Sequence, residues 1–436
     1  MAETTADESV IPIQTSTIRK IYFRLIPLLF CMMFVNYLDR INLGFAGLQM
    51  IQDLKFSSAV FGLGGSVFFL GYMVLQIPSN LILFRFGARH WLGGILTVWG
   101  FVAAAMAFVG GQTGFHVLRF LLGVAEAGLL PGLALYVTFW FPSRYRARAV
   151  GGYIIAGSFA AILGGPISGV LLTYMNDFAG LRGWQWMFIV EGAPAVLLGL
   201  VTLCYLPNGP TEAKWLNEDE RNWLETELRA ERAAIESVRH YAVLDSIRDI
   251  RVWVLSILFG CALVGIYGMF IWLPLIIQGL GKLSYLQVGL LSAVPPLLGV
   301  IGTIVVSISS DRTGDRKFHL AVIYAIGGIG MLGSALVKDP VIAYVSLCVA
   351  GLGMNSGNSL FWSLNASFMT GVAGAVSIAV VNMIAQFGGL VGPWSIGLVK
   401  TATGSFSIAL VVVAAFLFAA SAIAAAMRVT PKGRSS

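Results

Sequence analysis

The chain has 436 residues, of which 57% are hydrophobic and only 11% are charged. Soluble globular chains are about half apolar and about a quarter charged. This composition, with a mean hydropathy of +0.83, therefore excludes a soluble globule, a disordered chain and a disulfide scaffold. Twelve helical spans of about 20 residues would use about 240 residues, which is close to the apolar share of the chain.

Hydropathy predicts twelve membrane-spanning helices in two sets of six. The first set covers 21–48, 57–83, 90–110, 113–140, 148–175 and 185–206. The second set covers 252–278, 284–309, 318–337, 340–367, 371–399 and 405–427. We therefore expect an all-α polytopic membrane protein. Its expected parts are an N-terminal tail (1–20), a six-helix bundle (21–206), a charged, helical linker (207–250), a second six-helix bundle (251–428) and a C-terminal tail (429–436).

Lysine and arginine are unevenly distributed between the two sides of the predicted bundle. If the N-terminus is cytoplasmic, the inner tails and loops hold 21 of them and the outer loops hold five. Because lysine and arginine mark cytoplasmic loops, we expect both termini in the cytoplasm. The twelve helical spans and the short tails indicate a bacterial inner-membrane protein. The lysine and arginine bias accounts for the net charge of +7, so the expected partner is the lipid bilayer and not nucleic acid.

Two pairs of motifs recur at one offset of 227 residues. RFGAR at 85–89 matches RTGDR at 312–316, and the Gly-Pro pair at 165–166 matches the pair at 392–393. Two unrelated motifs in one register indicate a duplicated six-helix half, which is a transporter architecture. In this register Tyr267 takes the place of Arg40, so the second half lacks the charged pair of the first.

Longer motifs carry a family resemblance. They are NYLDRIN at 36–42, RFLLGVAEAG at 119–128, FWFP at 139–142, RAR at 146–148, GWQW at 183–186, EG at 191–192, FW at 361–362, Asn382 and GGLVGP at 388–393. Over nearly its whole length the chain resembles the major facilitator superfamily. Within that superfamily it is most similar to the anion:cation symporters, and among those to bacterial sugar-acid and tartrate permeases. The resemblance implies two pseudo-symmetric six-helix halves.

The loop motifs at 85–89 and 312–316 depart in part from the family pattern. An aspartate commonly precedes the first arginine in the family, but the first copy has Phe84 there and only the second copy has the aspartate. The resemblance implies a structural or gating role for the charged residues of both copies, which are Arg85, Arg89, Asp311, Arg312 and Arg316.

Five charged side chains lie well inside the predicted spans: Asp39, Arg40, Arg119, Glu126 and Glu191. A charge at the bilayer centre costs about 2.5–3.5 kcal/mol on insertion scales, so such residues are functional candidates, with structural ion pairs as the alternative. Arg119 and Glu126 are seven residues apart and share a helix face. Adjacent residues point about 100° apart, so we expect Arg40 to face a cavity and Asp39 a neighbouring helix, 113–140.

Arginine suits a carboxylate substrate, because its planar fork donates two parallel hydrogen bonds and stays charged when buried. The carboxyls of Asp39 and Glu126 suit proton carriage. The resemblance implies these same roles, and a relay or charge-balancing role for Arg119. It also implies substrate contacts, with interhelical packing as the alternative, by Tyr37, Tyr72, Ser359, Trp362 and Asn382; the repeat register adds Tyr267. Glu191, a family hallmark, is expected to have a structural or gating role.

The leading prediction is a secondary transporter, not an enzyme, that imports a small organic anion together with protons by alternating access. The expected anion is a sugar acid or dicarboxylate, such as an aldonate, an aldarate or tartrate. The alternative is proton-antiport efflux of drugs or metabolites, because 161–169 partly resembles an antiporter motif; a membrane sensor is disfavoured by the short linker. We expect a monomer without cofactor or metal, because the four cysteines and four histidines are not at metal-ligand spacing.

Overall fold

The computed structural model describes residues 13–236, 248–368 and 371–427. Within these ranges the chain is helical and contains no β-strand. Residues 1–12 of the predicted N-terminal tail and the whole predicted C-terminal tail lie outside the described residues, as does 237–247 of the predicted linker.

The helices form two sets joined by α9 (Glu218–Glu236). The N-terminal half contains α1 (Ile13–Asp53), α2 (Ser58–Phe86), α3 (Ala88–Ala105), α4 (Gln112–Glu126), α5 (Leu129–Thr138), α6 (Ser143–Ile154), α7 (Ala156–Tyr174) and α8 (Gly183–Tyr205). The C-terminal half contains α11 (Ile250–Gln278), α12 (Tyr285–Ser292), α13 (Val294–Thr313), α14 (Arg316–Leu336), α15 (Pro340–Phe368), α16 (Gly371–Ala385), α17 (Phe387–Thr403) and α18 (Phe406–Ala426).

Twelve segments of the described chain are long and apolar enough to cross a membrane, and each overlaps one predicted span. Four of them consist of two successive helices, namely α4 with α5, α6 with α7, α12 with α13 and α16 with α17. The prediction of an all-α protein with twelve transmembrane helices in two six-helix halves is confirmed.

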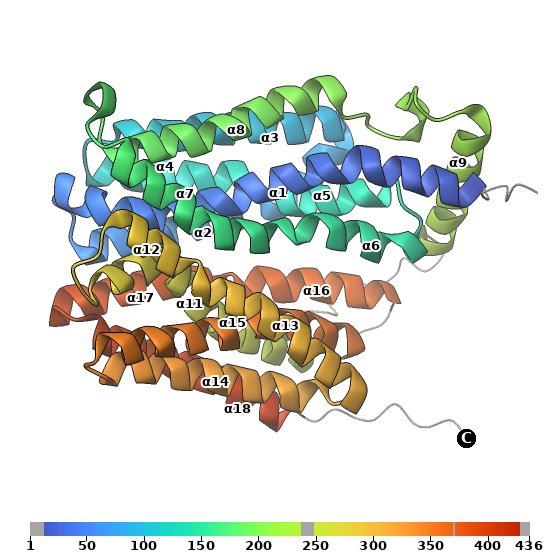
Figure 1. Cartoon of the computed structure of the whole chain (residues 1–436). Helices are drawn as coiled ribbons and strands as arrows, with labels where there is room; N and C mark the ends of the chain where they lie inside the picture. Colours follow the sequence, from blue (N-terminus) through green and yellow to red (C-terminus); the bar gives the residue numbers. More distant parts are fainter. Residues whose placement is uncertain (1–12, 237–247, 369–370, 428–436) are drawn as a thin grey trace, which may run out of the picture.

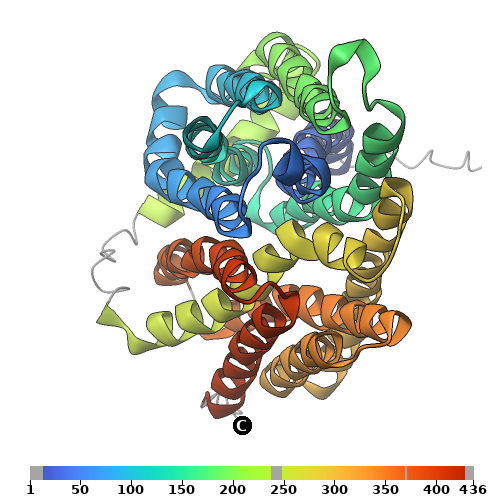
Figure 2. The same cartoon turned by 90° about the vertical axis from the view of Figure 1, so that its left-hand side faces the viewer.

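The two halves lie side by side, with the helices running lengthwise (Figure 1). Helix α9 and both ends of the described chain lie at one end of the bundle, which we call the linker end; we call the opposite end the far end. Figure 2 looks onto the far end and shows the N-terminal half above the C-terminal half.

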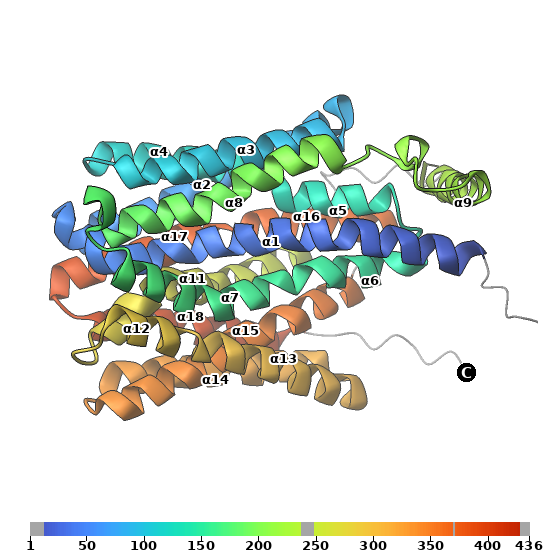
Figure 3. The same cartoon turned by 45° about the horizontal axis from the view of Figure 1, so that its top comes forward.

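Helix α9 is docked on the N-terminal half. Its Glu220, which is 2% exposed, forms an ion pair of 2.6 Å with Lys20 of α1. Two further ion pairs join α9 to α6: Glu227 with Arg144 at 3.3 Å, and Glu231 with Arg146 at 3.0 Å. Burial raises the pKa of Glu220, but hydrogen bonds from Lys20 and the Asn217 backbone outweigh it and hold the pKa below its ordinary value. The ion pair with Lys20 therefore persists at neutral pH, and α9 extends beyond the linker end as part of this half (Figure 3).

The two halves are joined at the far end. One buried core runs through the C-terminal half and continues into the far-end residues of the N-terminal half, whereas the rest of the N-terminal half has a separate core. The Ala59 backbone N–H donates to Thr401 Oγ1 at 2.8 Å, and the Trp394 N–H donates to Ser66 Oγ at 3.0 Å. Helices α7 and α12 approach so closely that a Cβ added to Gly165 would lie 2.5 Å from the Gly289 carbonyl oxygen.

Candidate functional site

An ion pair between Arg40 and Glu126 lies at the centre of the candidate site. Arg40 Nε donates to Glu126 Oε2 at 3.1 Å, with side-chain exposures of 9% and 0%. Asn36 Nδ2 donates to the same oxygen at 2.7 Å. The other oxygen, Glu126 Oε1, is buried without a hydrogen-bond partner among the described residues. One oxygen of the Glu126 carboxyl is therefore hydrogen-bonded twice, and the other can accept a proton or a further hydrogen bond.

Helix lengths place this pair deep in the bundle. Arg40 lies 13 residues before Asp53, the far end of α1, and Glu126 lies 14 residues after Gln112, the far end of α4. At 1.5 Å per residue, both Cα atoms are about 20 Å from the far end. The two residues are therefore at one depth, and the ion pair bridges two helices within the membrane-spanning part.

Three aromatic rings surround the Arg40 guanidinium. Its Cζ atom is 4.9 Å from the ring centroid of Tyr72, 5.4 Å from Phe68 and 5.8 Å from Tyr37. Such rings stabilise a cation while leaving its N–H groups unused. Since Nε makes the bond to Glu126, the two terminal nitrogens can serve an incoming carboxylate. Phe68 was missed in the sequence, because one phenylalanine within an apolar helix carries no signal.

Asp39 turns away from Arg40 and lies against two neighbouring helices, α3 and the predicted α4. Its Oδ2 accepts a 3.2 Å hydrogen bond from Trp99 Nε1 of α3, and its Oδ1 accepts one of 3.1 Å from Asn42 Nδ2. Its interhelical hydrogen bond therefore comes from α3, and Glu126 and Arg119 of the predicted segment 113–140 are its electrostatic neighbours. Trp99 was missed because an indole in an apolar span is read as packing.

Arg119 lies beside the pair without bonding to Glu126. Its Nε donates to the Gly64 carbonyl of α2 at 3.2 Å, and its Cζ lies 4.9 Å from the Phe68 ring. Its Nη1 atom is buried without a hydrogen-bond partner in the described chain. Phe68 thus lies against both arginines, and Glu126 is an electrostatic neighbour of both.

The C-terminal half contributes a neutral residue, Tyr267, beside the pair. Tyr267 of α11 packs on Phe69 of α2 with ring centroids 4.3 Å apart, and it is an electrostatic neighbour of Arg40. Trp362 of α15 packs instead on Phe259, 5.2 Å away. Ser359 is exposed and Asn382 half-buried, and the described residues give neither a side-chain contact with Arg40. Substrate contacts by Ser359, Trp362 and Asn382 stay predictions.

The charged loop residues differ between the two copies. Arg89 donates to the Leu206 carbonyl at 2.7 Å and pairs with Glu212 at 3.0 Å, so it ties α3 to the end of α8. Arg316 donates to the Ser363 carbonyl at 3.2 Å and lies 3.9 Å from Asp311. Arg85 lies over the neighbouring Phe86 ring, and Arg312 is exposed. Their predicted structural or gating roles stay predictions.

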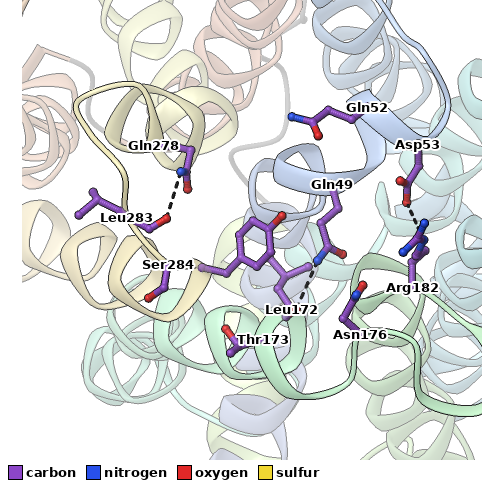
Figure 4. Close-up of a pocket in the computed structure, with 11 residues that line it drawn as sticks. Gln49, Gln52, Asp53, Leu172, Thr173, Asn176, Arg182, Gln278, Leu283 and Ser284 are labelled. Atoms are coloured by element: carbon purple, nitrogen blue, oxygen red, sulfur yellow. Dashed lines mark hydrogen bonds and ion pairs between the residues drawn. The ribbon is translucent and has the colours of Figure 1, made fainter.

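A pocket of about 610 Å³ opens at the far end between the halves. Gln49, Asp53 and Arg182 line it from the N-terminal half, and Gln278 and Ser284 from the C-terminal half (Figure 4). Arg182 already lies 3.7 Å from Asp53 and 3.0 Å from Asp177. Because two carboxylates balance its charge, this pocket is less suited to an anion than the surroundings of Arg40.

Comparison with known proteins identifies the family. Residues 29–393 match the sequence profile of the Major Facilitator Superfamily. The chain belongs to this superfamily. It is therefore a transporter and not an enzyme, as predicted, and it is a multi-pass membrane protein.

Full-length relatives and one solved structure agree with this assignment. This major facilitator transporter is 44% identical over 405 residues to a protein of Agrobacterium vitis named "Putative tartrate transporter", covering 93% of both chains. It is 40% identical over 394 residues to a "Quinolone resistance transporter" of Acinetobacter baumannii, covering 90% of this chain and 91% of the other. A bacterial homologue of the human lysosomal transporter Spinster superposes with a TM-score of 0.76 at 15% identity, covering 95% and 97%; this likeness concerns the fold alone.

Proposed function

We propose that the protein imports a small organic anion, a sugar acid or a dicarboxylate such as tartrate, in symport with protons across a bacterial inner membrane. The observation that carries this proposal is the buried Arg40–Glu126 pair, with Arg40 under three aromatic rings. Arg40 is buried in the membrane and is paired with the Glu126 carboxylate through a non-covalent bond. It can therefore exchange Glu126 for the carboxylate of a substrate. The relative of Agrobacterium vitis named for tartrate supports the substrate class.

Proton coupling follows from competition for Arg40. The carboxylate of Glu126 and the carboxylate of the substrate would bind the same guanidinium. Protonation of Glu126 weakens its hold on Arg40 and favours the anion, and a bound anion favours protonation of Glu126 by the same factor. Unpartnered Glu126 Oε1 is the atom that would receive the proton.

Alternating access is supported by the contact between the two halves at the far end of the bundle. With the termini in the cytoplasm, as the lysine and arginine bias favours, the joined far end faces outward. The described conformation would then be closed to the outside, and separation of the halves at the α7–α12 crossing would open it. The close approach of Gly165 and Gly289 depends on the absence of side chains there.

Replacing Gly165 by valine should weaken the outward-closed conformation. The added Cβ would lie 2.5 Å from the Gly289 carbonyl oxygen, and a clash of about 1–3 kcal/mol would shift the equilibrium about 5- to 150-fold. The measurement is the rate of maleimide labelling of Ser284→Cys at the pocket rim, in a variant lacking the four native cysteines. Gly94→Val is the control, because a Cβ there meets nothing within 4 Å. Equal labelling rates in both variants would refute this role of the crossing.

The function is tested by uptake into proteoliposomes with an imposed inward proton gradient. The panel would contain labelled tartrate, galactonate, glucarate and phthalate, with a fluoroquinolone as the control. Gradient-driven accumulation of a carboxylate is the expected result. Failure of all four carboxylates would overturn the proposal.

Proton-antiport efflux is the second candidate, and the Acinetobacter baumannii relative named for quinolone resistance favours it. A fluoroquinolone also carries a carboxylate, so Arg40 could engage either compound. The direction of coupling separates the two functions. Accumulation of the drug only when the proton gradient is reversed, with no carboxylate uptake, would support efflux.

A further inference from the structure

Glu191 is a second buried carboxyl group that the Arg40–Glu126 pair does not use. It lies on α8, eight residues from the far end of that helix at Gly183, and it is 2% exposed. Ser168 Oγ of α7 donates to its Oε1 at 3.0 Å. Its Oε2 atom is buried and has no hydrogen-bond partner among the described residues.

No cation balances this carboxyl in the described part of the chain. The recorded ion pairs include none with Glu191, and its electrostatic neighbours are Asp39, Ser168 and Asn42. On α3, Gly100 and Ala103 pack against the adjoining Gly192, and the Trp99 N–H donates to Asp39. The facing titratable group on α1 is Asp39, an acid, and α7 contributes the Ser168 hydroxyl. An ionised carboxylate in such surroundings is strongly unfavourable, so the group neutralises instead.

Asn42 connects Glu191 to Asp39. Its Nδ2 donates to Asp39 Oδ1 at 3.1 Å, and its side chain is a polar neighbour of the Glu191 carboxyl. Its own Oδ1 atom is buried without a partner in the described ranges, like Glu191 Oε2. Two acceptors without donors lie in one small polar cluster, and one proton on Glu191 gives that cluster the missing donor.

We propose that Glu191 stays protonated throughout the transport cycle and donates a hydrogen bond to the Asn42 carbonyl oxygen. This bond holds Asn42 in the orientation that binds Asp39. The series Ser168–Glu191–Asn42–Asp39 is then a hydrogen-bonded support behind the predicted proton carrier. Glu191 acts through Asn42 and is a positioning residue. This role rests on the proposed proton function of Asp39, whereas the protonation of Glu191 does not.

Infrared spectroscopy of the purified protein tests the protonation without any substrate. Glutamate in water is ionised above about pH 5, so a carboxylic-acid C=O band that persists at about pH 8 reports a protonated buried acid. We expect Glu191→Gln to remove such a band and Glu225→Gln, on the surface of α9, to leave it. A band that keeps its full intensity in Glu191→Gln, or no band in the unmodified protein, would overturn the proposal even if carboxylate transport is demonstrated.

The pH profile of uptake tests the positioning role. Glu191→Gln keeps a neutral side chain whose NH₂ can donate to Asn42, so gradient-driven accumulation should remain within about twofold of the unmodified protein. Asn42→Leu removes a donor from Asp39 and should move the pH profile to higher pH by stabilising the protonated acid. Loss of accumulation in Glu191→Gln at a normal protein level would identify Glu191 as a proton carrier and refute the fixed proton. An unmoved profile in Asn42→Leu would refute the support of Asp39.

Discussion

Replacing Arg40 by lysine should reduce uptake of the carboxylate between about 10-fold and 100-fold. A hydrogen bond to a charged group contributes about 1.5–3 kcal/mol, and lysine loses the planar fork that holds a carboxylate with two parallel bonds. Lysine keeps the positive charge, so the loss would report geometry and not net charge. The aromatic rings of Tyr72, Phe68 and Tyr37 would also lose the flat guanidinium that lies among them.

The measurement is initial uptake against substrate concentration in proteoliposomes of equal protein content. Arg251→Lys is the matched control, because Arg251 is exposed and pairs with Asp249 at the start of α11. Near-normal uptake by Arg40→Lys would remove Arg40 from the substrate site. An equal loss in Arg251→Lys would show that the assay responds to the substitution type and not to the position.

Replacing Glu126 by glutamine should abolish accumulation driven by a proton gradient while exchange of internal for external anion stays measurable. Glutamine cannot lose or gain a proton, so it removes the competition between Glu126 and the substrate for Arg40. The arginine remains available, and the affinity for the anion should not fall. The split between the two activities is the signature of coupling, because a general defect would reduce both.

Accumulation and exchange can be measured on the same vesicles, with and without the imposed gradient. Glu225→Gln serves as the control, since Glu225 pairs with Arg229 on the surface of α9. Equal loss of accumulation and exchange in Glu126→Gln, at a normal protein level, would contradict a specific proton role and leave Glu126 as a structural partner of Arg40.

The sequence predicted the spans well, because hydropathy depends on local composition. The span predicted at 90–110, for example, is found at Ala88–Phe108. The separation of Arg40 from Asp39 followed from helix geometry, and the five intramembrane charges stood out against an apolar background. The partner of Asp39 could not be predicted in this way, since Trp99 is 60 residues away in the chain and contributes one N–H from an otherwise apolar ring.

The end of the bundle at which the two halves are joined could not be predicted from the sequence either. Whether the far end or the linker end is joined depends on a balance between two packings of the same residues, and states of a transporter differ by only a few kcal/mol. Gly165 and Gly289 fit a close crossing, but glycines are frequent throughout the chain. The unpartnered atoms of Glu191 and Asn42 likewise emerge only when three helices are placed together.

The buried charges have an electrical consequence. Arg40 and the charged side chains buried inside the described spans all belong to the N-terminal half. With Glu191 protonated, two arginines and two carboxylates remain there, and their sum is zero. If Asp39 and Glu126 each take a proton, a substrate with one negative charge leaves the loaded site with one positive charge, and a dianion leaves it neutral. Since one elementary charge across 100 mV corresponds to about 2.3 kcal/mol, the response of uptake to membrane voltage would reveal the charge of the natural anion.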